Sequence, residues 1–236
     1  MKDPFLSIVI PCFNEEKRLS HTLDKILSYL RRQNYSWEIL VSDDGSTDST
    51  AKLAEEKLGT LPHKLLRNLY NEGKGEAVKR GMLESHAPYV LFTDADLSTP
   101  IEEVEKLLTQ LQDGFDVAIG SRGLATSQVE VPQNFFRQSM GKIFNRIARL
   151  VSFKQIHDSQ CGFKCFRRDA AQSLFKAQKL KGFSFDAEIM YLAQKRGLRI
   201  AEVPIIWRNS PASRVHILKD SFLMFLDIFR IPWIHR

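Results

Sequence analysis

Cysteine is scarce in this sequence of 236 residues, and long apolar runs are absent. Cys12, Cys161 and Cys165 cannot all pair with one another, and no second ligand pair accompanies the last two. A disulfide framework and a zinc knuckle are therefore disfavoured, and we expect three buried thiols that behave as small apolar side chains. No charge-free apolar stretch reaches the length of a membrane-spanning helix. The first residues lack the layout of a secretory signal, so we expect a cytoplasmic protein.

Charge of either sign is not scarce, but its distribution along the chain is uneven. Hydrophobic residues make up 43% and charged residues 26%, which is typical of a globular domain and excludes disordered or collagen-like chains. The net charge of +6 combines residues 1–118, with 14 basic and 20 acidic residues, and residues 119–236, with 20 basic and 8 acidic residues. An acidic half can hold a metal ion, and a basic half can bind phosphates or anionic lipid. Because the basic residues alternate with large apolar ones, we expect a membrane surface and no nucleic acid as partner.

Short β-branched runs alternate with segments of helical periodicity in the first half. Apolar residues between positions 19 and 30 share one helical face, Ser46 and Thr47 can cap a second helix, and Pro100 suits the first turn of a third. Strand–helix alternation predicts an α/β fold with a mostly parallel central sheet. The predicted buried strands are residues 6–10, 37–42, 64–69, 89–94 and 116–121.

Polar or glycine-containing segments follow all five predicted strands. Ligands of open parallel sheets bind outside the carboxyl ends of the strands, so these segments are expected to form one shared site. The segments are residues 11–16, 43–46, 71–75, 94–96 and 120–122.

Two acidic clusters among these segments have candidate roles. Asp94 and Asp96 provide hard oxygen ligands at a spacing that suits Mg²⁺ or Mn²⁺, although a solvated acidic turn would have the same sequence. Asp43 and Asp44 are consistent with a plain turn, or with carboxylates that accept hydrogen bonds from a base or ribose.

The segment Gly73-Lys74-Gly75 can bring backbone amides and an ammonium group against a diphosphate. A glycine-rich turn with Lys74 in solvent is the alternative. The segment matches neither the phosphate-binding loop of P-loop proteins nor the dinucleotide fingerprint, so both of these enzyme classes are disfavoured.

Read together, the segments IVIPCFNEE (8–16), DDGSTD (43–48), NEGKG (71–75) and DAD (94–96) resemble the GT-A fold of family 2 inverting glycosyltransferases. In the second half, Arg122 and residues 157–164, 185–188 and 202–205 are similar to dolichyl-phosphate β-glucosyltransferases and, less closely, to dolichyl-phosphate mannose synthases. The resemblance covers residues 5–230. Eukaryotic glucosyltransferases of this type usually carry an N-terminal membrane helix, which we do not find here.

The resemblance implies a single GT-A domain over residues 1–236. Residues 1–121 would form its nucleotide-sugar-binding half, and residues 122–236 its acceptor-binding, membrane-facing half. Asp94 and Asp96 would hold Mg²⁺ or Mn²⁺. The residues expected to bind the nucleotide sugar are Pro11, Phe13, Glu15, Asp43, Asp44, Lys74, Asp94, Ala95, Asp96 and Gln160.

The resemblance also assigns phosphate-binding and catalytic residues. Asp96, Arg122 and Asp158 would be the catalytic group, with Asp158 lining the sugar. The expected phosphate-binding arginines, with the acceptor phosphate as their main ligand, are Arg122, Arg137, Arg208 and Arg214, the last at a position where lysine is common.

The implied reaction transfers a hexose, glucose from UDP-glucose, to dolichyl or undecaprenyl phosphate and inverts the anomeric centre. A lipid monophosphate, with a second pKa near ~6, is largely ionised at neutral pH, so it needs arginines for positioning and no carboxylate base. A GDP-mannose donor, a non-lipid acceptor and a non-catalytic sugar-nucleotide-binding module stay open as alternatives. The lipid length and the oligomeric state are open as well.

Two helices of the second half are predicted to be amphipathic and to lie at a membrane interface. Residues 140–151 and 217–231 each combine a charged edge with a broad apolar arc. Burial of both arcs in the protein core is the alternative. We therefore expect a peripheral protein on the cytoplasmic face of a membrane. His157 is expected to be structural, because neighbouring side chains on a strand point apart.

Overall fold

The computed structural model describes residues 3–131, 156–208 and 217–236, with side chains from residue 222 onward in the last range. Arg137, Arg214 and the predicted helix 140–151 lie outside the described residues. The elements are β1 (Leu6–Cys12), α1 (Glu16–Leu30), β2 (Trp37–Asp43), α2 (Thr50–Leu58), β3 (His63–Arg67), α3 (Lys74–Glu84), β4 (Tyr89–Thr93), η1 (Ile101–Glu103), α4 (Val104–Gln112), β5 (Val117–Ser121), β6 (Gln128–Val131), β7 (Phe163–Arg167), α6 (Arg168–Ala177), α7 (Phe185–Lys195), β8 (Ile200–Pro204), β9 (Ile206–Arg208) and α8 (Ile217–Ile234).

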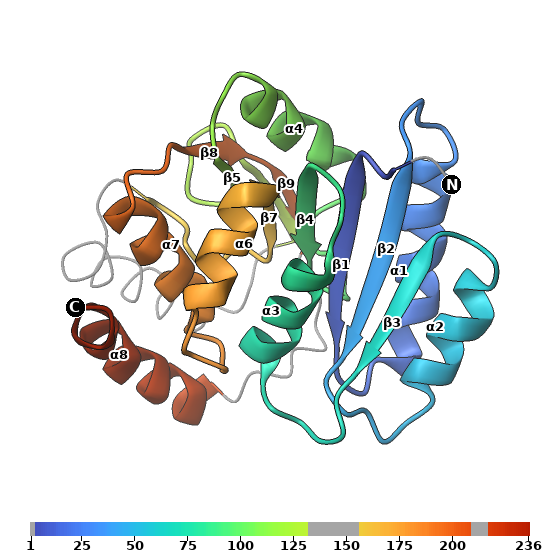
Figure 1. Cartoon of the computed structure of the whole chain (residues 1–236), viewed down its shortest axis with the longest axis horizontal. Helices are drawn as coiled ribbons and strands as arrows, with labels where there is room; N and C mark the ends of the chain where they lie inside the picture. The colour runs from blue at the N-terminus through green and yellow to red at the C-terminus, as the bar shows by residue number, and fades with distance from the viewer. Residues whose placement is uncertain (1–2, 132–155, 209–216) are drawn as a thin grey trace.

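The described strands form a seven-stranded sheet in the order β3-β2-β1-β4-β7-β5-β8, with β6 and β9 paired separately (Figure 1). Every neighbouring pair in the large sheet is parallel except those of β7, which runs antiparallel to both β4 and β5. The predicted α/β fold with a mostly parallel central sheet is confirmed.

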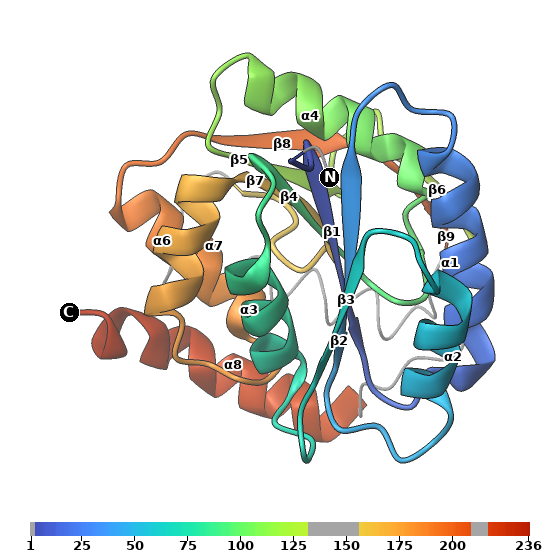
Figure 2. The ribbon, with the colours of Figure 1, turned by 45° about the vertical axis from the view of Figure 1, so that its right-hand side comes forward.

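Helices cover both faces of the sheet, which explains why its strands read as continuous apolar runs. One apolar core joins α1, α2 and α4 to the sheet, and the other joins α3, α6, α7 and α8 to the opposite face. Figures 1 and 2 show α3 and α6 side by side on the second face, with α8 along the lower edge. Both cores contain residues from both halves of the chain, so the molecule is a single α/β domain.

All five predicted strands are present, with ends shifted by a few residues at most. The predicted cap at Ser46 and Thr47 is wrong, because α2 begins at Thr50 and its N-cap residue Ser49 makes no side-chain cap hydrogen bond. Ser46 is used elsewhere: its Oγ accepts a hydrogen bond from the Asn14 N–H at 2.8 Å. The Thr47 N–H donates to Asn14 Oδ1 at 2.9 Å. These bonds tie the loop after β2 to the loop after β1.

The antiparallel strand β7 brings the second half of the chain to the ligand-binding end of the sheet. Its residue Phe163 lies opposite Thr93, the last residue of β4. Residues that precede β7 therefore lie beside residues that follow β4 and β5. We refer to residues 158–162 as the sugar-side turn, because the resemblance noted in the sequence implies that Asp158 lines the sugar.

Helix α8 is attached to the domain by one apolar side and by its last turn. Ile228 and Ile231 are buried against α7 and its neighbours. The ring of His235, just after the helix, contacts the buried carboxylate of Glu188 on α7 at 2.5 Å. Glu188 also accepts hydrogen bonds from the N–H groups of Lys179 and Leu180, at 2.8 and 2.9 Å. No helix in the described part of the chain combines the length and apolar character needed to cross a membrane.

Candidate active site

The loops after β1 and β2 form one wall of the candidate site. Glu15 is buried, and both of its oxygens are bound by the guanidinium of Arg18, at 2.7 and 2.5 Å. Its N–H donates to Thr50 Oγ1 at 2.7 Å. Pro11 is buried in β1, and Phe13 is half-buried in the following loop. The two loops are thus fixed by side-chain hydrogen bonds before any ligand binds.

The two aspartates after β2 have different environments. Asp44 binds the loop after β3, since its carboxylate accepts hydrogen bonds from Asn68 Nδ2 and from the N–H groups of Glu72 and Gly73, at 2.8–2.9 Å. Asp43 Oδ1 accepts the Ser46 N–H. Asp43 Oδ2 is buried and accepts no hydrogen bond; the Arg67 Nε lies 3.3 Å away, outside hydrogen-bond geometry. Asp43 therefore keeps one oxygen without a hydrogen bond, whereas both oxygens of Asp44 accept hydrogen bonds within the protein, and the nucleotide-binding role of both residues stays a prediction.

The start of α3 places Lys74 against the acidic loop after β4. Gly73, with φ of +111°, allows the chain to turn here, and a Cβ at this position would lie 2.5 Å from the Lys181 carbonyl oxygen. Lys74 Nζ contacts Asp94 Oδ1 at 2.6 Å and lies 5.4 Å from the centre of the Phe92 ring. Burial opposes the charge of Lys74, but Asp94 and Asp186 outweigh it and raise its pKa. Lys74 is therefore a charged group of the site and not a solvated one.

Asp96 lies two residues beyond Asp94 and is likewise partly buried. Its Oδ1 accepts the Ser98 N–H at 3.0 Å. Burial, and then the negative charge of Asp94, raise the pKa of Asp96. Ala95 lies between them with its carbonyl bound by Thr22 Oγ1 at 2.6 Å, which fixes the backbone of the loop. Two carboxylates that repel one another in this way form a favourable place for a cation.

A bidentate ion pair joins Arg122, which follows β5 and is partly buried, to the buried Asp158, which precedes the neighbouring strand β7. Arg122 Nε and one terminal nitrogen donate to the two Asp158 oxygens at 2.6 and 2.8 Å, and the Arg122 N–H adds a third bond at 3.0 Å. The guanidinium also lies 5.3 Å from the Trp207 ring centre. Burial opposes ionisation of Asp158, but Arg122 outweighs it and lowers its pKa. Asp158 is therefore an ionised partner of Arg122 and a poor proton acceptor.

The rest of the sugar-side turn presents one unpaired donor. Gln160 Nε2 is buried and has no hydrogen-bond partner, so it can donate to a ligand. Glu202 supports the turn by accepting the N–H groups of His157 and Asp158, and it also contacts the ring of His157. His157 lies before β7 and not on a strand, so the reason given for its structural role is wrong; its ring contacts Glu202 Oε2 at 2.9 Å, and the structural role stays a prediction.

The predicted phosphate-binding arginines are only partly brought to the site. Arg208 ends β9, where its N–H donates to the Ser98 carbonyl at 2.8 Å. Its exposed side chain forms an ion pair with Glu130 at 2.6 Å. Arg208 therefore borders the acidic loop through its backbone, and its phosphate role stays a prediction. The three cysteines are free and buried, as predicted.

Sequence reasoning missed three charged residues of the site. Arg18 could have been found from its position three residues after Glu15 on a helix. Lys164 and Asp186 form a buried ion pair behind the sugar-side turn, with exposed side-chain fractions of 1% and 4%. Lys164 lies in β7 between the apolar residues Phe163 and Cys165, and no periodicity of the sequence marks it as buried. Only its burial in the fold reveals its partner.

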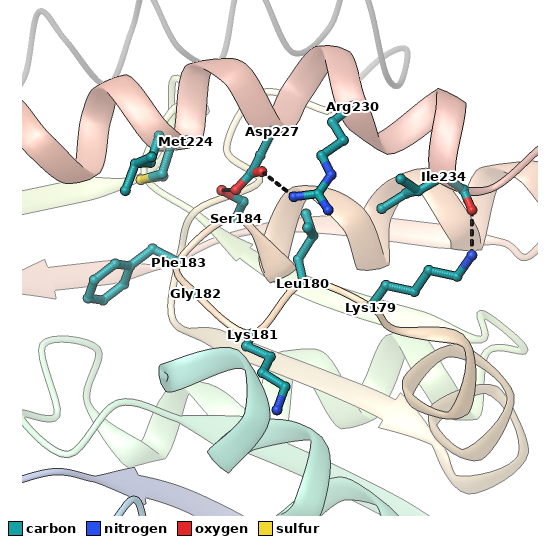
Figure 3. A pocket seen from close by; sticks show the side chains of 11 residues that line it. Lys179, Leu180, Lys181, Gly182, Phe183, Ser184, Met224, Asp227, Arg230 and Ile234 are labelled. Atoms are coloured by element: carbon teal, nitrogen blue, oxygen red, sulfur yellow. Dashed lines mark hydrogen bonds and ion pairs between the residues drawn. The ribbon is translucent and has the colours of Figure 1, made fainter. Parts of the chain in front are cut away.

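A separate pocket of about 480 Å³ lies between α8 and the segment 179–184 (Figure 3). Lys179, Lys181 and Arg230 contribute positive charge, and Leu180, Phe183, Leu223, Met224 and Ile234 contribute apolar surface. Asp227 is bound by Ser184 Oγ at 2.7 Å. The segment 179–184 also borders α3, because a Cβ at Gly75 would lie 2.8 Å from the carbonyl oxygens of Leu180 and Lys181.

Comparison with known proteins places this site in a family. A family model described as glycosyl transferase family 2 matches residues 7–175. The chain belongs to glycosyltransferase family 2. This family 2 chain is 36% identical over 240 residues to the dolichyl-phosphate beta-glucosyltransferase of Dictyostelium discoideum, an alignment that covers 96% of the chain and 73% of the relative.

Two solved structures share the fold of this family 2 glycosyltransferase. Mannosyl-3-phosphoglycerate synthase from Rubrobacter xylanophilus superposes with a TM-score of 0.73 at 19% identity, covering 98% of the chain and 73% of that protein. Glucosyl-3-phosphoglycerate synthase from Mycobacterium tuberculosis, solved with Mn²⁺, UDP-glucose and phosphoglyceric acid, gives 0.67 at 18% identity, covering 97% and 78%. The resemblance noted in the sequence to the GT-A fold is therefore confirmed.

Removing the Arg122 side-chain charge tests the ion pair at the centre of this site. Arg122→Met leaves the buried Asp158 carboxylate without its partner, so we expect a loss of about 3–5 kcal/mol in the free energy of unfolding at pH 7. The pKa of Asp158 is lowered in the folded protein, so the pair stabilises the fold above the unfolded pKa of about 3.9. That stability is lost as the pH falls through the folded pKa.

Urea denaturation at pH 7, pH 5 and pH 3 measures the difference between wild type and the variant. We expect the difference to be largest at pH 7 and 5 and to shrink at pH 3. Arg208→Met is the matched control, because its ion pair with Glu130 is exposed to solvent and its loss should leave the stability nearly unchanged. A difference between wild type and Arg122→Met that does not change with pH would contradict the assignment.

Proposed function

We propose that this chain transfers glucose from UDP-glucose to dolichyl phosphate or a related polyprenyl phosphate, with inversion at the anomeric carbon. The observation that carries the proposal is the similarity over nearly the whole chain to a dolichyl-phosphate beta-glucosyltransferase. The charged groups after β1, β2, β4 and β5 support it, because they supply the donor-binding and phosphate-binding functions that such a transfer needs.

A phosphate acceptor is consistent with the state of the site carboxylates. A hydroxyl nucleophile would need a base near it, yet Asp158 is locked by Arg122 with a lowered pKa. A lipid monophosphate attacks with an oxygen that is already ionised, so the protein has only to position it. Arg122 fits this task, since a guanidinium that uses one edge for Asp158 keeps further N–H donors for phosphate oxygens.

The donor would bind along the ends of β1, β2 and β4. The buried Asp43 Oδ2, which accepts no hydrogen bond in the protein, can accept one from an N–H of the base or from a ribose hydroxyl. Lys74 can exchange its contact with Asp94 for a diphosphate oxygen, and Gln160 Nε2 can donate to a sugar hydroxyl. Pro11, Phe13 and Glu15 border the same region.

The site fits a divalent cation held by Asp94 and Asp96. The negative charge of Asp94 raises the pKa of Asp96, and a cation between the two carboxylates would relieve this repulsion. Among the described residues, no cluster of three or more His, Cys, Asp or Glu side chains could hold a metal ion by itself. Mg²⁺ and Mn²⁺ are suited to this arrangement, since they are often bound by one or two carboxylates together with substrate phosphates. When bound, the cation would neutralise the charge that develops on the departing nucleoside diphosphate.

The lipid acceptor would be reached from a membrane surface contacted by α8. Six large apolar side chains on this helix are 39–66% exposed; we call them the apolar strip of α8, and they are Phe222, Leu223, Phe225, Leu226, Phe229 and Trp233. Exposed apolar patches of this kind mark interaction surfaces. The cations Lys179, Lys181 and Arg230 in the adjoining pocket complement anionic head groups (Figure 3). We place the protein peripherally on the cytoplasmic face.

The transfer reaction is tested with purified protein, detergent, Mn²⁺ and radiolabelled donors. We expect UDP-glucose with dolichyl phosphate to give a β-linked glucosyl phospholipid, and dolichol without phosphate to give none. Asp96→Asn should lower kcat by about 100-fold or more with little change in unfolding temperature. Transfer from GDP-mannose and not from UDP-glucose would contradict the proposed donor. Transfer to a water-soluble sugar would contradict the proposed acceptor.

Nucleotide preference gives an independent check of the donor. With Mn²⁺ present, UDP should raise the unfolding temperature more than GDP, because the tighter ligand stabilises the fold more at equal concentration. A larger shift with GDP would contradict the UDP assignment. Nucleotide binding with no transfer to any acceptor would favour a non-catalytic sugar-nucleotide-binding module.

Membrane docking is tested with charges placed in the apolar strip of α8. Phe225 and Phe229 are exposed and contact each other with ring centres 5.2 Å apart. Because burying a Phe side chain is worth roughly 1.5–3 kcal/mol, Phe225→Glu with Phe229→Glu should weaken binding to vesicles at least about tenfold. Leu69→Glu is the matched control, since Leu69 is 97% exposed on the loop between β3 and α3. Equal sedimentation of both variants with vesicles would exclude α8 as the docking surface.

A further inference from the structure

The sugar-side turn presses directly against the side chain of Asp94. The Asp94 N–H donates to the Gly162 carbonyl at 3.1 Å, which continues the antiparallel pairing of β4 and β7. A Cβ built on Gly162 would lie 1.9 Å from Asp94 Oδ2 and 2.4 Å from its Cγ. The backbone of Gly162 does not adopt the left-handed conformation, so glycine is required here for space alone. Only a hydrogen atom fits between this turn and the carboxylate.

The Asp94 carboxylate is confined from a second side by Lys74. Lys74 Nζ contacts Oδ1 at 2.6 Å, whereas the Gly162 position crowds Oδ2 most closely. The carboxylate thus lies between a cation on α3 and the backbone of the sugar-side turn. Its orientation depends on where that turn is held.

The buried ion pair of Lys164 and Asp186 holds the turn from behind. Lys164 Nζ donates to the Cys161 carbonyl at 2.5 Å and forms a short ion pair with Asp186 Oδ1. Lys164 also lies 5.6 Å from the Phe92 ring centre, in the strand next to β7. Both charges are almost fully buried, which is costly unless they are paired. Their contact with the carbonyl that precedes Gly162 indicates a positioning task for this pair.

We propose that Gly162 and the Lys164–Asp186 pair are positioning residues that set the orientation of Asp94 for cation and donor binding. The proposal rests on the proposed function, in which Asp94 binds the cation and the donor diphosphate. The two ends of the sugar-side turn then act on different groups: Asp158 orients Arg122, and Gly162 orients Asp94. One short segment thus sets the positions of both Arg122, which would bind phosphate, and Asp94, which would bind the donor.

The first experiment introduces a methyl group at the crowded position. Gly162→Ala displaces the Asp94 carboxylate, so we expect the affinity for Mn²⁺ in the presence of UDP, measured by calorimetry, to fall at least tenfold. The affinity for UDP without metal should change less than twofold. Gly182→Ala is the matched control, because a Cβ there meets no atom within 4 Å and the Gly182 carbonyl accepts the Phe185 N–H at the start of α7. Mn²⁺ binding by Gly162→Ala equal to that of wild type would overturn the proposal.

A thermal unfolding cycle separates this contact from general damage to the fold. Gly162→Ala should lower the unfolding temperature in the wild-type background and change it little in an Asp94→Ala background, where the crowded carboxylate is gone. Equal losses in both backgrounds would overturn the proposal. The cycle needs neither metal nor substrate. If wild type itself fails to bind Mn²⁺ with UDP, the proposed function fails while the steric contact is still measured.

The second experiment separates positioning by Lys164 from its contribution to stability. Lys164→Met alone leaves Asp186 buried and unpaired, so it should destabilise the protein. Lys164→Met with Asp186→Leu removes both charges, so most of the lost stability should return. The Cys161 carbonyl stays without its donor in both variants, and Mn²⁺ affinity with UDP should stay reduced at least fivefold. Recovery of Mn²⁺ affinity together with the unfolding temperature would show that the pair is only structural.

Discussion

The antiparallel direction of β7 is the constraint on which the site depends. Between the parallel strands β4 and β5, a reversed strand begins where its neighbours end. The sugar-side turn, which precedes β7, is therefore placed beside the acidic loop after β4 and the arginine after β5. If β7 ran parallel to its neighbours, Asp158 and Gln160 would lie at the amino ends of the strands, away from Asp94 at the carboxyl end of β4. One reversed strand thus unites groups from both halves of the chain.

Most charges at this edge of the sheet are paired with one another in the protein itself. Lys74 contacts Asp94, Arg122 binds Asp158, and Arg18 binds Glu15. Such pairs fix side-chain directions before a ligand binds, which lowers the entropic cost of binding. Few buried side-chain polar atoms of the described residues lack a hydrogen bond: Asp43 Oδ2 and Gln160 Nε2 lie at this end of the sheet, and Gln178 Oε1 lies behind the start of α3. The same end of the sheet therefore has side chains that are already oriented by ion pairs and side-chain atoms that can still hydrogen-bond a ligand.

The sequence predicted much of the fold, and the structure explains what it could not predict. Parallel buried strands have apolar runs of their own, so their positions could be found without tertiary information. The pairing of Arg122 with Asp158 joins residues 36 positions apart through the order of strands, which no local pattern contains. Capping by Ser46 was predicted wrongly because its hydroxyl binds the β1 loop, a tertiary contact that overrides the local preference.

The sequence pattern also cannot predict the role of a residue that is needed for its small size. Gly162 looks like an ordinary turn residue in the sequence, and only the position of Asp94 in the fold shows why a methyl group does not fit. Likewise, the apolar arc of 217–231 was compatible with core burial or exposure. The structure buries Ile228 and Ile231 and leaves the apolar strip of α8 exposed, while a membrane role for that strip stays a prediction.

The carboxylate of Glu188 joins the end of α8 to the segment 179–184. Its oxygens contact the ring of His235 at the end of α8 and accept hydrogen bonds from the N–H groups of Lys179 and Leu180. Those residues lead into the segment whose carbonyl oxygens touch Gly73 and Gly75 on either side of Lys74. A change in the tilt of α8 must therefore either break these buried hydrogen bonds or move the segment beside Lys74. Together with the hydrogen bond from Ser184 to Asp227, Glu188 thus couples the tilt of α8 to the backbone beside Lys74.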